Sequence, residues 1–317
     1  MSTQTLEPMA DVPSTDVPDV FSNWKTFLLA LPQPILVLGS MAAVATMVLT
    51  EWINADLFAT LMIVLPMPAI FVAERIWTKR QDWLLEPKEM FEDAFWLAFG
   101  FFLWVPLYSD YFETPISRGF EAVRDASPLG LTLAPTTFFG LIGAALLVKI
   151  CSSFVYYWLH RVQHESVFWW RIHATHHHIT KMGCMRGWRT HPLEHATLFL
   201  SMPIALALMG ASGDVIAVAA AFSMWNGELN HSNLPLRSLP VYNWVFATAE
   251  QHHAHHAMDR AQADSNYGCE IILWDRIFGT YCGDTSVERI GAGTGQALSI
   301  KEQLALAFYP KDRLTSL

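Results

Sequence analysis

Apolar residues gather in four long stretches along this chain, followed by a pair of shorter ones. The long stretches cover residues 27–50, 57–73, 94–108 and 131–159, and the pair covers residues 196–211 and 215–225. A helix needs about 20 residues to cross a bilayer. The first and fourth long stretches are therefore long enough to cross it, the second is just long enough and the third is marginal. We predict four membrane-spanning helices, then a helical hairpin, re-entrant or complete, interrupted at Gly213-Asp214 and returning to its starting side.

The segments around these stretches predict how the chain is organised. Residues 1–22 are polar and acidic, which predicts a disordered tail. We assign residues 23–130 to membrane helices, residues 131–282 to a domain that begins with the fourth span, and residues 283–317 to a C-terminal tail.

Basic residues predict the orientation of the chain. The loop after the second stretch carries Arg75, Lys79, Arg80 and Lys88, residues 51–56 carry no basic residue, and the loop 110–130 carries two against four acidic ones. Cytoplasmic loops are enriched in Lys and Arg, so we expect both termini in the cytoplasm. The fourth span then ends at the cytoplasmic face, where we expect a helical cap.

The composition agrees with a membrane protein. Hydrophobic residues make up 52% of the 317 residues and charged residues 15%, with a mean hydropathy of +0.26. The net charge of −9 argues against nucleic acid as a partner. The four cysteines form no CxxC pair, so we expect free thiols.

Histidines carry the strongest chemical signal, because all thirteen lie between His160 and His256. They recur at i, i+3 and i+4, positions that share one face of a helix, and imidazole is the commonest metal ligand. An octahedral ion offers about six positions, so nine imidazoles predict a site for two metal ions in the cap. The predicted ligands are His160, His164, His173, His176, His177, His231, His252, His255 and His256.

Other residues are candidates for the surroundings of these ligands. His191 is either a tenth ligand or a hydrogen-bonding partner of a ligand. Ligating histidines usually donate the N–H of their second ring nitrogen to an acceptor, and the acidic residues available for this are Glu165, Glu194, Glu228, Glu250 and Asp275. The aromatic candidates for the lipid entry are Trp158, Phe168, Trp169, Trp188 and Trp225. The further candidates for the surroundings are His178, His195, His253, Glu194, Asn233 and Asp275.

The ligand types narrow the choice of metal. No cysteine follows the histidine spacing, and the HExxH pattern of zinc proteases is absent, because Arg161 follows His160. An excess of imidazole suits iron or copper, and two irons could use O2 to attack an unactivated C–H bond. A membrane zinc hydrolase and a non-catalytic metal-binding or transport protein are the alternatives.

The ordered motifs resemble the sterol desaturase/fatty acid hydroxylase superfamily over roughly residues 140–282. These motifs are HRVQH at 160–164, WRIHATHH at 170–177, RTHPLE at 189–194, HSN at 231–233, HHAHH at 252–256, DSNYG at 264–268 and LWDRIFGTY at 273–281. The resemblance implies two irons, O2 as co-substrate, and hydroxylation or desaturation of a sterol, fatty acyl chain or related lipid. It also implies a separate electron donor, either a ferredoxin or cytochrome b5 with its reductase. The short loops and motif variants favour a bacterial inner membrane over an ER membrane.

Overall fold

In the computed structural model, the described residues are 20–316 except 22, 52–54 and 129. These residues form helices and two isolated bridges but no strand. The predicted all-helical fold is confirmed.

The helices fall into a long and a short class. The long helical segments are α1–α2 (Trp24–Ala30 and Pro32–Thr50), the continuous run from α5 to α7 (Pro87–Ala126), α8 (Phe138–Glu165) and α12 (Gly213–His231). The short helices are α3 (Ala55–Val64), α4 (Pro66–Ile76), η1 (Gln81–Trp83), α9 (Val167–His177), η4 (Cys184–Trp188), α10 (Pro192–His195), η5 (Leu198–Leu200), α11 (Ser201–Met209), α13 (Pro240–Asn243), α14 (Ala249–His255), α15 (Arg260–Ala263), α16 (Leu273–Phe278), α17 (Ile300–Ala305), η6 (Leu306–Phe308) and α18 (Lys311–Ser316).

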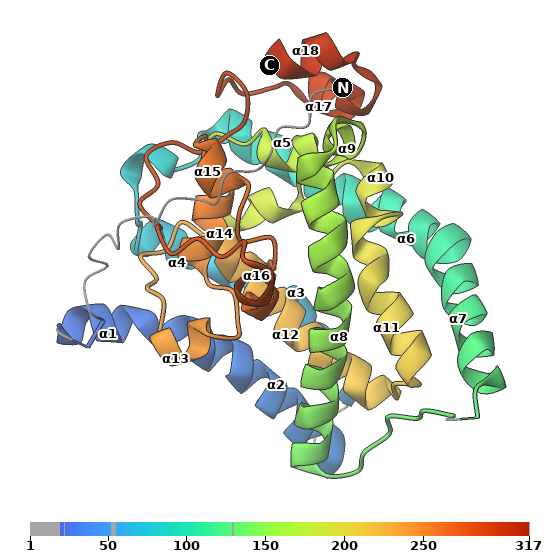
Figure 1. The fold of residues 1–317 in the computed structure, drawn as a ribbon. Coiled ribbons are helices and arrows are strands. Elements are labelled where there is room, and N and C mark those ends of the chain that lie inside the picture. Colours follow the sequence, from blue (N-terminus) through green and yellow to red (C-terminus); the bar gives the residue numbers. More distant parts are fainter. Residues whose placement is uncertain (1–19, 22, 52–54, 129, 317) are drawn as a thin grey trace.

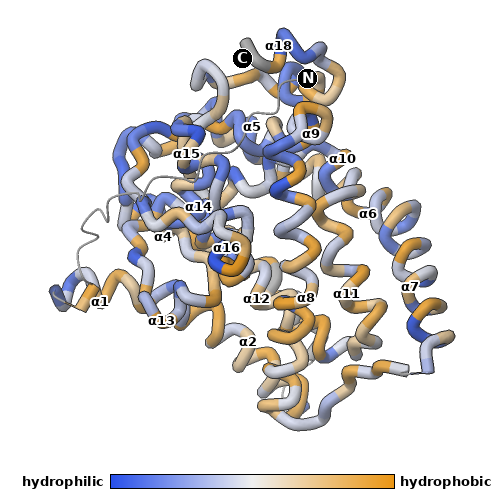
Figure 2. The backbone as a smooth tube through the Cα atoms, viewed as in Figure 1, coloured by the Kyte–Doolittle hydropathy of each residue, from blue (hydrophilic) through white to orange (hydrophobic). Residues whose placement is uncertain are grey.

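Helices α2, α8, α11 and α12 extend through the lower part of the molecule, and α9, α15, α17 and α18 lie above them (Figure 1). Apolar residues dominate α8, α11 and α12, whereas polar residues concentrate around α14, α15 and α18 (Figure 2).

Four helical segments of the described chain are long and apolar enough to cross a membrane, which is the predicted number, but Pro192–Met209 was predicted as a short hairpin arm. They are Trp24–Thr50, Pro87–Ala126, Phe138–Glu165 and Pro192–Met209. The predicted span 57–73 is not among them. It divides into α3 and α4 at Leu65, because Pro66 has no N–H to continue the helical ladder.

The third apolar stretch lies inside a helix much longer than expected. We expected a loop over 110–130, but the helix that starts at Pro87 runs on to Ala126. A capping box between Glu86 and Glu89 begins it. Two π-helical turns, Gly100–Trp104 and Ser109–Glu113, carry it through the polar residues that the sequence suggested as a boundary.

The predicted helical hairpin is present, formed by α11 and α12. Its turn lies at residues 210–212 and not at Gly213-Asp214, which begin α12. Gly210 has a φ of 59°, and a Cβ there would lie 2.5 Å from the Leu131 carbonyl oxygen, so only glycine fits. The Ser212 side chain accepts a hydrogen bond from the Val215 N–H and starts α12.

The main core lies between α2, α8 and α12. Valine and alanine side chains fill much of it, together with a few larger residues such as Phe222, and the three helices pack against one another. This packing fixes the cap-side ends of α8 and α12, which carry His160, His164 and His231. The buried residues include Val37, Met41, Val44, Leu141, Ala145, Val148, Val215, Val218 and Phe222.

The segment 283–317 contains helices that pack against the cap. Leu298, Leu306 and Leu314 are buried together with Ala174 of α9. The Thr175 hydroxyl donates a hydrogen bond of 2.9 Å to the Gln303 carbonyl. The predicted disordered tail 1–22 lies outside the described residues, except for residues 20 and 21.

A buried charge cluster joins η4 to α5. Arg186 Nε lies 3.0 Å from Asp93 Oδ2, and Arg189 Nε donates a hydrogen bond to the same carboxylate. All three residues are buried. The cluster therefore holds η4, whose Gly187 lies against the His231 ring: a Cβ there would lie 3.0 Å from His231 Nδ1.

We predict that Asp93→Asn destabilises the protein by about 1–3 kcal/mol, because Arg186 and Arg189 lose the buried carboxylate that they share and keep only Glu89 (3.1 Å) and Glu92 (3.3 Å). Thermal unfolding in one detergent would measure the loss as a lower Tm. Asp125→Asn is the control, since Asp125 pairs with Arg124 and its side chain is 66% exposed. Equal melting temperatures for the Asp93 variant and the unmodified protein would contradict the prediction.

Candidate metal centre

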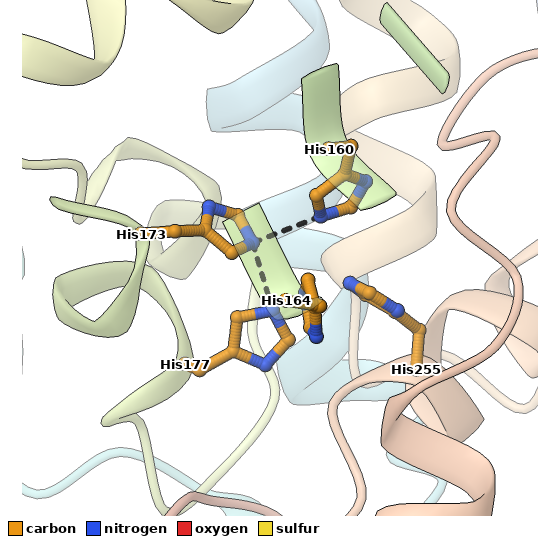
Figure 3. A group of neighbouring side chains, drawn as sticks. All are labelled: His160, His164, His173, His177 and His255. Carbon is orange, nitrogen blue, oxygen red and sulfur yellow. Dashed lines mark hydrogen bonds between the residues drawn. The ribbon is translucent and has the colours of Figure 1, made fainter. Parts of the chain in front are cut away.

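All nine histidines predicted as ligands are buried and lie in two groups at the junction of the cap with α8 and α12. Within each group, the ligand-capable nitrogens all lie within 4.8 Å of one another. The five-histidine group contains His160, His164, His173, His177 and His255, and Figure 3 shows their rings facing a common centre. The four-histidine group contains His176, His231, His252 and His256.

Both HxxHH motifs are divided between the two groups. In α9, the i, i+4 pair His173 and His177 belongs to the five-histidine group, while His176 belongs to the other. In and after α14 the arrangement is reversed, because the i, i+4 pair belongs to the four-histidine group and His255 to the five-histidine group. Each of these short helices therefore contributes to both groups.

Inner nitrogens of the five-histidine group lie close together. His173 Nε2 is 2.8 Å from His160 Nε2 and 3.0 Å from His177 Nε2. Two imidazole nitrogens that bind one ion at right angles, each about 2.1 Å from it, lie about 3 Å apart. His164 Nε2 and His255 Nε2 are buried without a hydrogen-bond partner. A cation would satisfy all five nitrogens, so the group fits a metal ion.

Similar spacings occur in the four-histidine group. His231 Nε2 lies 3.3 Å from His176 Nε2 and 2.9 Å from His252 Nε2, and His256 Nε2 lies 3.2 Å from His252 Nε2. Burial lowers the pKa of His252 and His256 well below its usual value. Neutral imidazole is the form that binds metal, so this group also fits an ion.

Outer nitrogens of the five-histidine group meet acceptors that orient the rings. Such contacts fix the tautomer and leave Nε2 free for a metal. Burial also lowers the pKa of His255 to about 3, which keeps its ring neutral. The contacts are His160 Nδ1 to the Tyr267 carbonyl (2.7 Å), His164 Nδ1 to Asp264 (3.4 Å), His173 Nδ1 to Glu194 (3.2 Å) and His255 Nδ1 to the Ser265 carbonyl (2.8 Å).

The two groups are adjacent. The rings of His177 and His256, one from each group, are stacked with their centroids 4.5 Å apart. Two ions bound here would therefore be close neighbours in one centre.

A cavity of about 340 Å³ borders both groups. His173 of the first group and three histidines of the second line one part of it. Apolar side chains line another part, so the cavity can admit a hydrocarbon chain next to the histidines. These side chains are Trp188, Leu198, Phe199, Met202 and Met224.

The other predicted residues have different positions. Glu194 contacts a ring of the centre, as expected. His191 lies outside both groups, since its Nε2 lies 3.3 Å from the Leu304 carbonyl and its Nδ1 accepts from the Leu193 N–H. His195 lines the cavity, where its ring stacks on Phe199.

The remaining candidates support the cap. His178 ends α9, and burial lowers its pKa to about 4. His253 Nδ1 lies 3.0 Å from Lys79 Nζ. Asn233 exchanges hydrogen bonds with the Arg80 backbone, so it holds the loop before η1.

Asp275 acts on the centre only through the backbone. It accepts hydrogen bonds from the N–H groups of Tyr267 and Gly268 and thereby positions the carbonyl that His160 contacts. The sequence could not reveal the carbonyl acceptors, because every residue carries a backbone carbonyl and no residue type marks the ones that contact a histidine. Sequence reasoning also missed Asp264, although the DSNYG motif contains it.

Comparison with known proteins matches residues 145–280 to the fatty acid hydroxylase family. An ornithine lipid hydroxylase of Rhizobium tropici is 30% identical over 170 residues, which cover 53% of this chain and 51% of that protein. The alkylglycerol monooxygenase of Homo sapiens is 29% identical over 159 residues, which cover 50% of this chain and 34% of that protein. A very-long-chain aldehyde decarbonylase of Arabidopsis thaliana is 28% identical over 152 residues, covering 44% and 24%.

The matching region spans about half the length of the Rhizobium tropici protein and less of the other two. No solved structure matches. The family match spans the whole segment from His160 to His256 that supplies the nine histidines. These relatives all belong to one superfamily, which confirms the resemblance predicted from the motifs. Residues 145–280 of this chain are therefore similar to the fatty acid hydroxylase family and to these lipid-oxidising relatives.

Proposed function

We propose that this protein is a membrane-bound di-iron enzyme that uses O2 to hydroxylate a C–H bond of a membrane lipid. The observation that carries the proposal is the arrangement of nine buried imidazoles in two adjacent groups beside a cavity with apolar walls. The named activities of the relatives, lipid hydroxylation and alkylglycerol oxygenation, support the reaction class.

The proposed ligands are the nine histidines of the two groups. Iron bound there supplies the O2 activation that side chains alone lack. Nitrogen-rich donor sets suit iron, and the match of residues 145–280 to the fatty acid hydroxylase family supports iron over zinc.

The chain's own residues orient the ligands and keep water away. Glu194 Oε1 accepts the Nδ1 proton of His173, so His173 Nε2 is directed inward. The carbonyls of Tyr267 and Ser265 do the same for His160 and His255. The site is buried, so it keeps bulk water out and limits side reactions that would consume the oxidant.

The proposed reaction needs an electron donor. Inserting one oxygen atom of O2 into a C–H bond, with the other leaving as water, consumes two electrons and two protons. We propose that a separate donor, a ferredoxin or cytochrome b5 with its reductase, supplies them.

We also propose that the protein is embedded in a bacterial inner membrane and that its cap faces the cytoplasm. The basic residues Arg161, Arg171 and Lys181 of the cap support this orientation, together with those of the loop after α4. The bacterial relative supports the location.

We predict that the protein purified from iron-rich medium contains about two irons per chain. His255→Ala and His256→Ala should each retain about one, because these neighbouring residues belong to different groups. Elemental analysis by mass spectrometry measures the metals.

His178→Ala is the control for metal content, since His178 is buried and belongs to neither group. Retention of both irons in the His255 and His256 variants would contradict the ligand assignment. Two zincs that iron cannot replace would instead favour a hydrolase.

We predict that cells expressing the protein form an oxygenated lipid that contains 18O when they are grown under 18O2. Lipid extracts analysed by mass spectrometry would reveal it. His176→Ala should lower this product to background while the protein still inserts, because His176 is a proposed ligand. A product that persists without O2 would refute oxygenation.

We predict that green fluorescent protein fused after Leu317 is fluorescent in a bacterial host and that alkaline phosphatase fused there is inactive. The reason is the concentration of Lys and Arg on the cap side, which the positive-inside rule places in the cytoplasm. The opposite pair of results would reverse the proposed orientation.

A further inference from the structure

Lys149 is a charged residue in the middle of an apolar helix. It lies in α8, one of the segments able to cross a membrane, and its side chain is 3% exposed. Ionisable residues inside membrane helices are costly and mark functional sites more often than structural ones. Neither the histidine groups nor their outer contacts involve Lys149.

The Lys149 ammonium has two polar partners. It forms an ion pair with Glu270 and donates a hydrogen bond of 2.7 Å to the Ser223 hydroxyl. Glu270 directly follows Cys269, whose Sγ lies 3.6 Å from His160 Nδ1. One peptide bond therefore separates the ion-paired Glu270 from a residue that contacts the five-histidine group.

Lys149 and Glu270 also line the cavity that borders the histidines. The hydroxyl-bearing residues Ser152, Ser153 and Ser223 line it with them. The wall of the cavity therefore combines charged and hydroxyl groups with the apolar side chains named above.

Stability alone explains such a pair poorly, because buried ion pairs can often be replaced by apolar residues without loss. The volume of about 340 Å³ is at the small end of ligand cavities, which range over about 300–1,000 Å³. A cavity of this size holds only the reacting part of a lipid. Because Lys149, Glu270 and hydroxyl groups line the cavity, that part of the lipid must carry a polar group that can hydrogen-bond to them.

We infer that Lys149 and Glu270 form a subsite for a neutral hydrogen-bonding group of the lipid, such as a hydroxyl or ester, and so place a carbon near that group at the metal centre. The inference rests on the proposed function. The pair has no net charge, and Glu194 also lines the cavity, so an anionic group is disfavoured. Oxidation would occur near the lipid's polar region and not at the far end of its chain.

Relative binding of three probes with the same chain length tests the subsite. An equimolar mixture of 1-monopalmitoylglycerol, palmitate and hexadecane is added to the metal-loaded protein in dodecyl maltoside. Bound probes are quantified by mass spectrometry after gel filtration and compared with protein-free micelles. We expect 1-monopalmitoylglycerol to be enriched over hexadecane by about tenfold, the size typical of a hydrogen bond to a charged group.

The double variant Lys149→Met/Glu270→Gln should lose this enrichment. It removes both charges together, so no unpaired charge stays buried. Lys181→Met is the matched control, because Lys181 pairs with Glu89 at 2.6 Å and does not line the cavity. Metal content, measured for every variant, shows whether the centre is intact.

Equal enrichment in the double variant and the unmodified protein would overturn the subsite, and so would preferential binding of palmitate. Enrichment that depends on Lys149 and Glu270 would support it. If the unmodified protein showed this enrichment but formed no O2-dependent product, the proposed reaction would fail and the subsite would stand.

Discussion

Crowding of nine imidazoles around two points is the constraint on which the rest of this structure depends. A neutral imidazole has one donor and one acceptor nitrogen, so rings facing each other at about 3 Å cannot all satisfy one another by hydrogen bonds. Cations at the two points would remove the conflict, and the outer carbonyls and carboxylates would then fix the rings that they contact. The helices α8, α9, α12 and α14 all end or turn where their histidines reach these points.

Short helices of the cap depend on contacts made elsewhere. A helix of seven residues such as α14 is unstable alone. Its capping box between Thr248 and Gln251 and its burial compensate. The long apolar helices supply the platform, since packing of α2, α8 and α12 fixes two of the elements that carry histidines. The buried pairing of Asp93 with two arginines extends this platform to η4.

Residue type and spacing were enough to select the histidines: the nine predicted ligands are the nine histidines that the structure gathers into two groups. Whether a helix runs on without a break could not be predicted in the same way. The apolar length of residues 57–73 does not reveal that the helix divides at Pro66. The division of each HxxHH motif between two groups depends on how α9 and α14 face each other. Partners such as Lys149 and Glu270 are far apart in the sequence, and no local pattern connects them.

The position of the cavity has a consequence for kinetics. Its walls come partly from α8 and from the segment around Phe199 that leads into α11, and both belong to helical segments able to cross a membrane. Under the proposed function, a lipid would enter sideways from the bilayer without passing through water. Turnover would then follow the mole fraction of the substrate in the membrane and not its bulk concentration, so diluting the bilayer with an inert lipid would slow the reaction at constant total substrate.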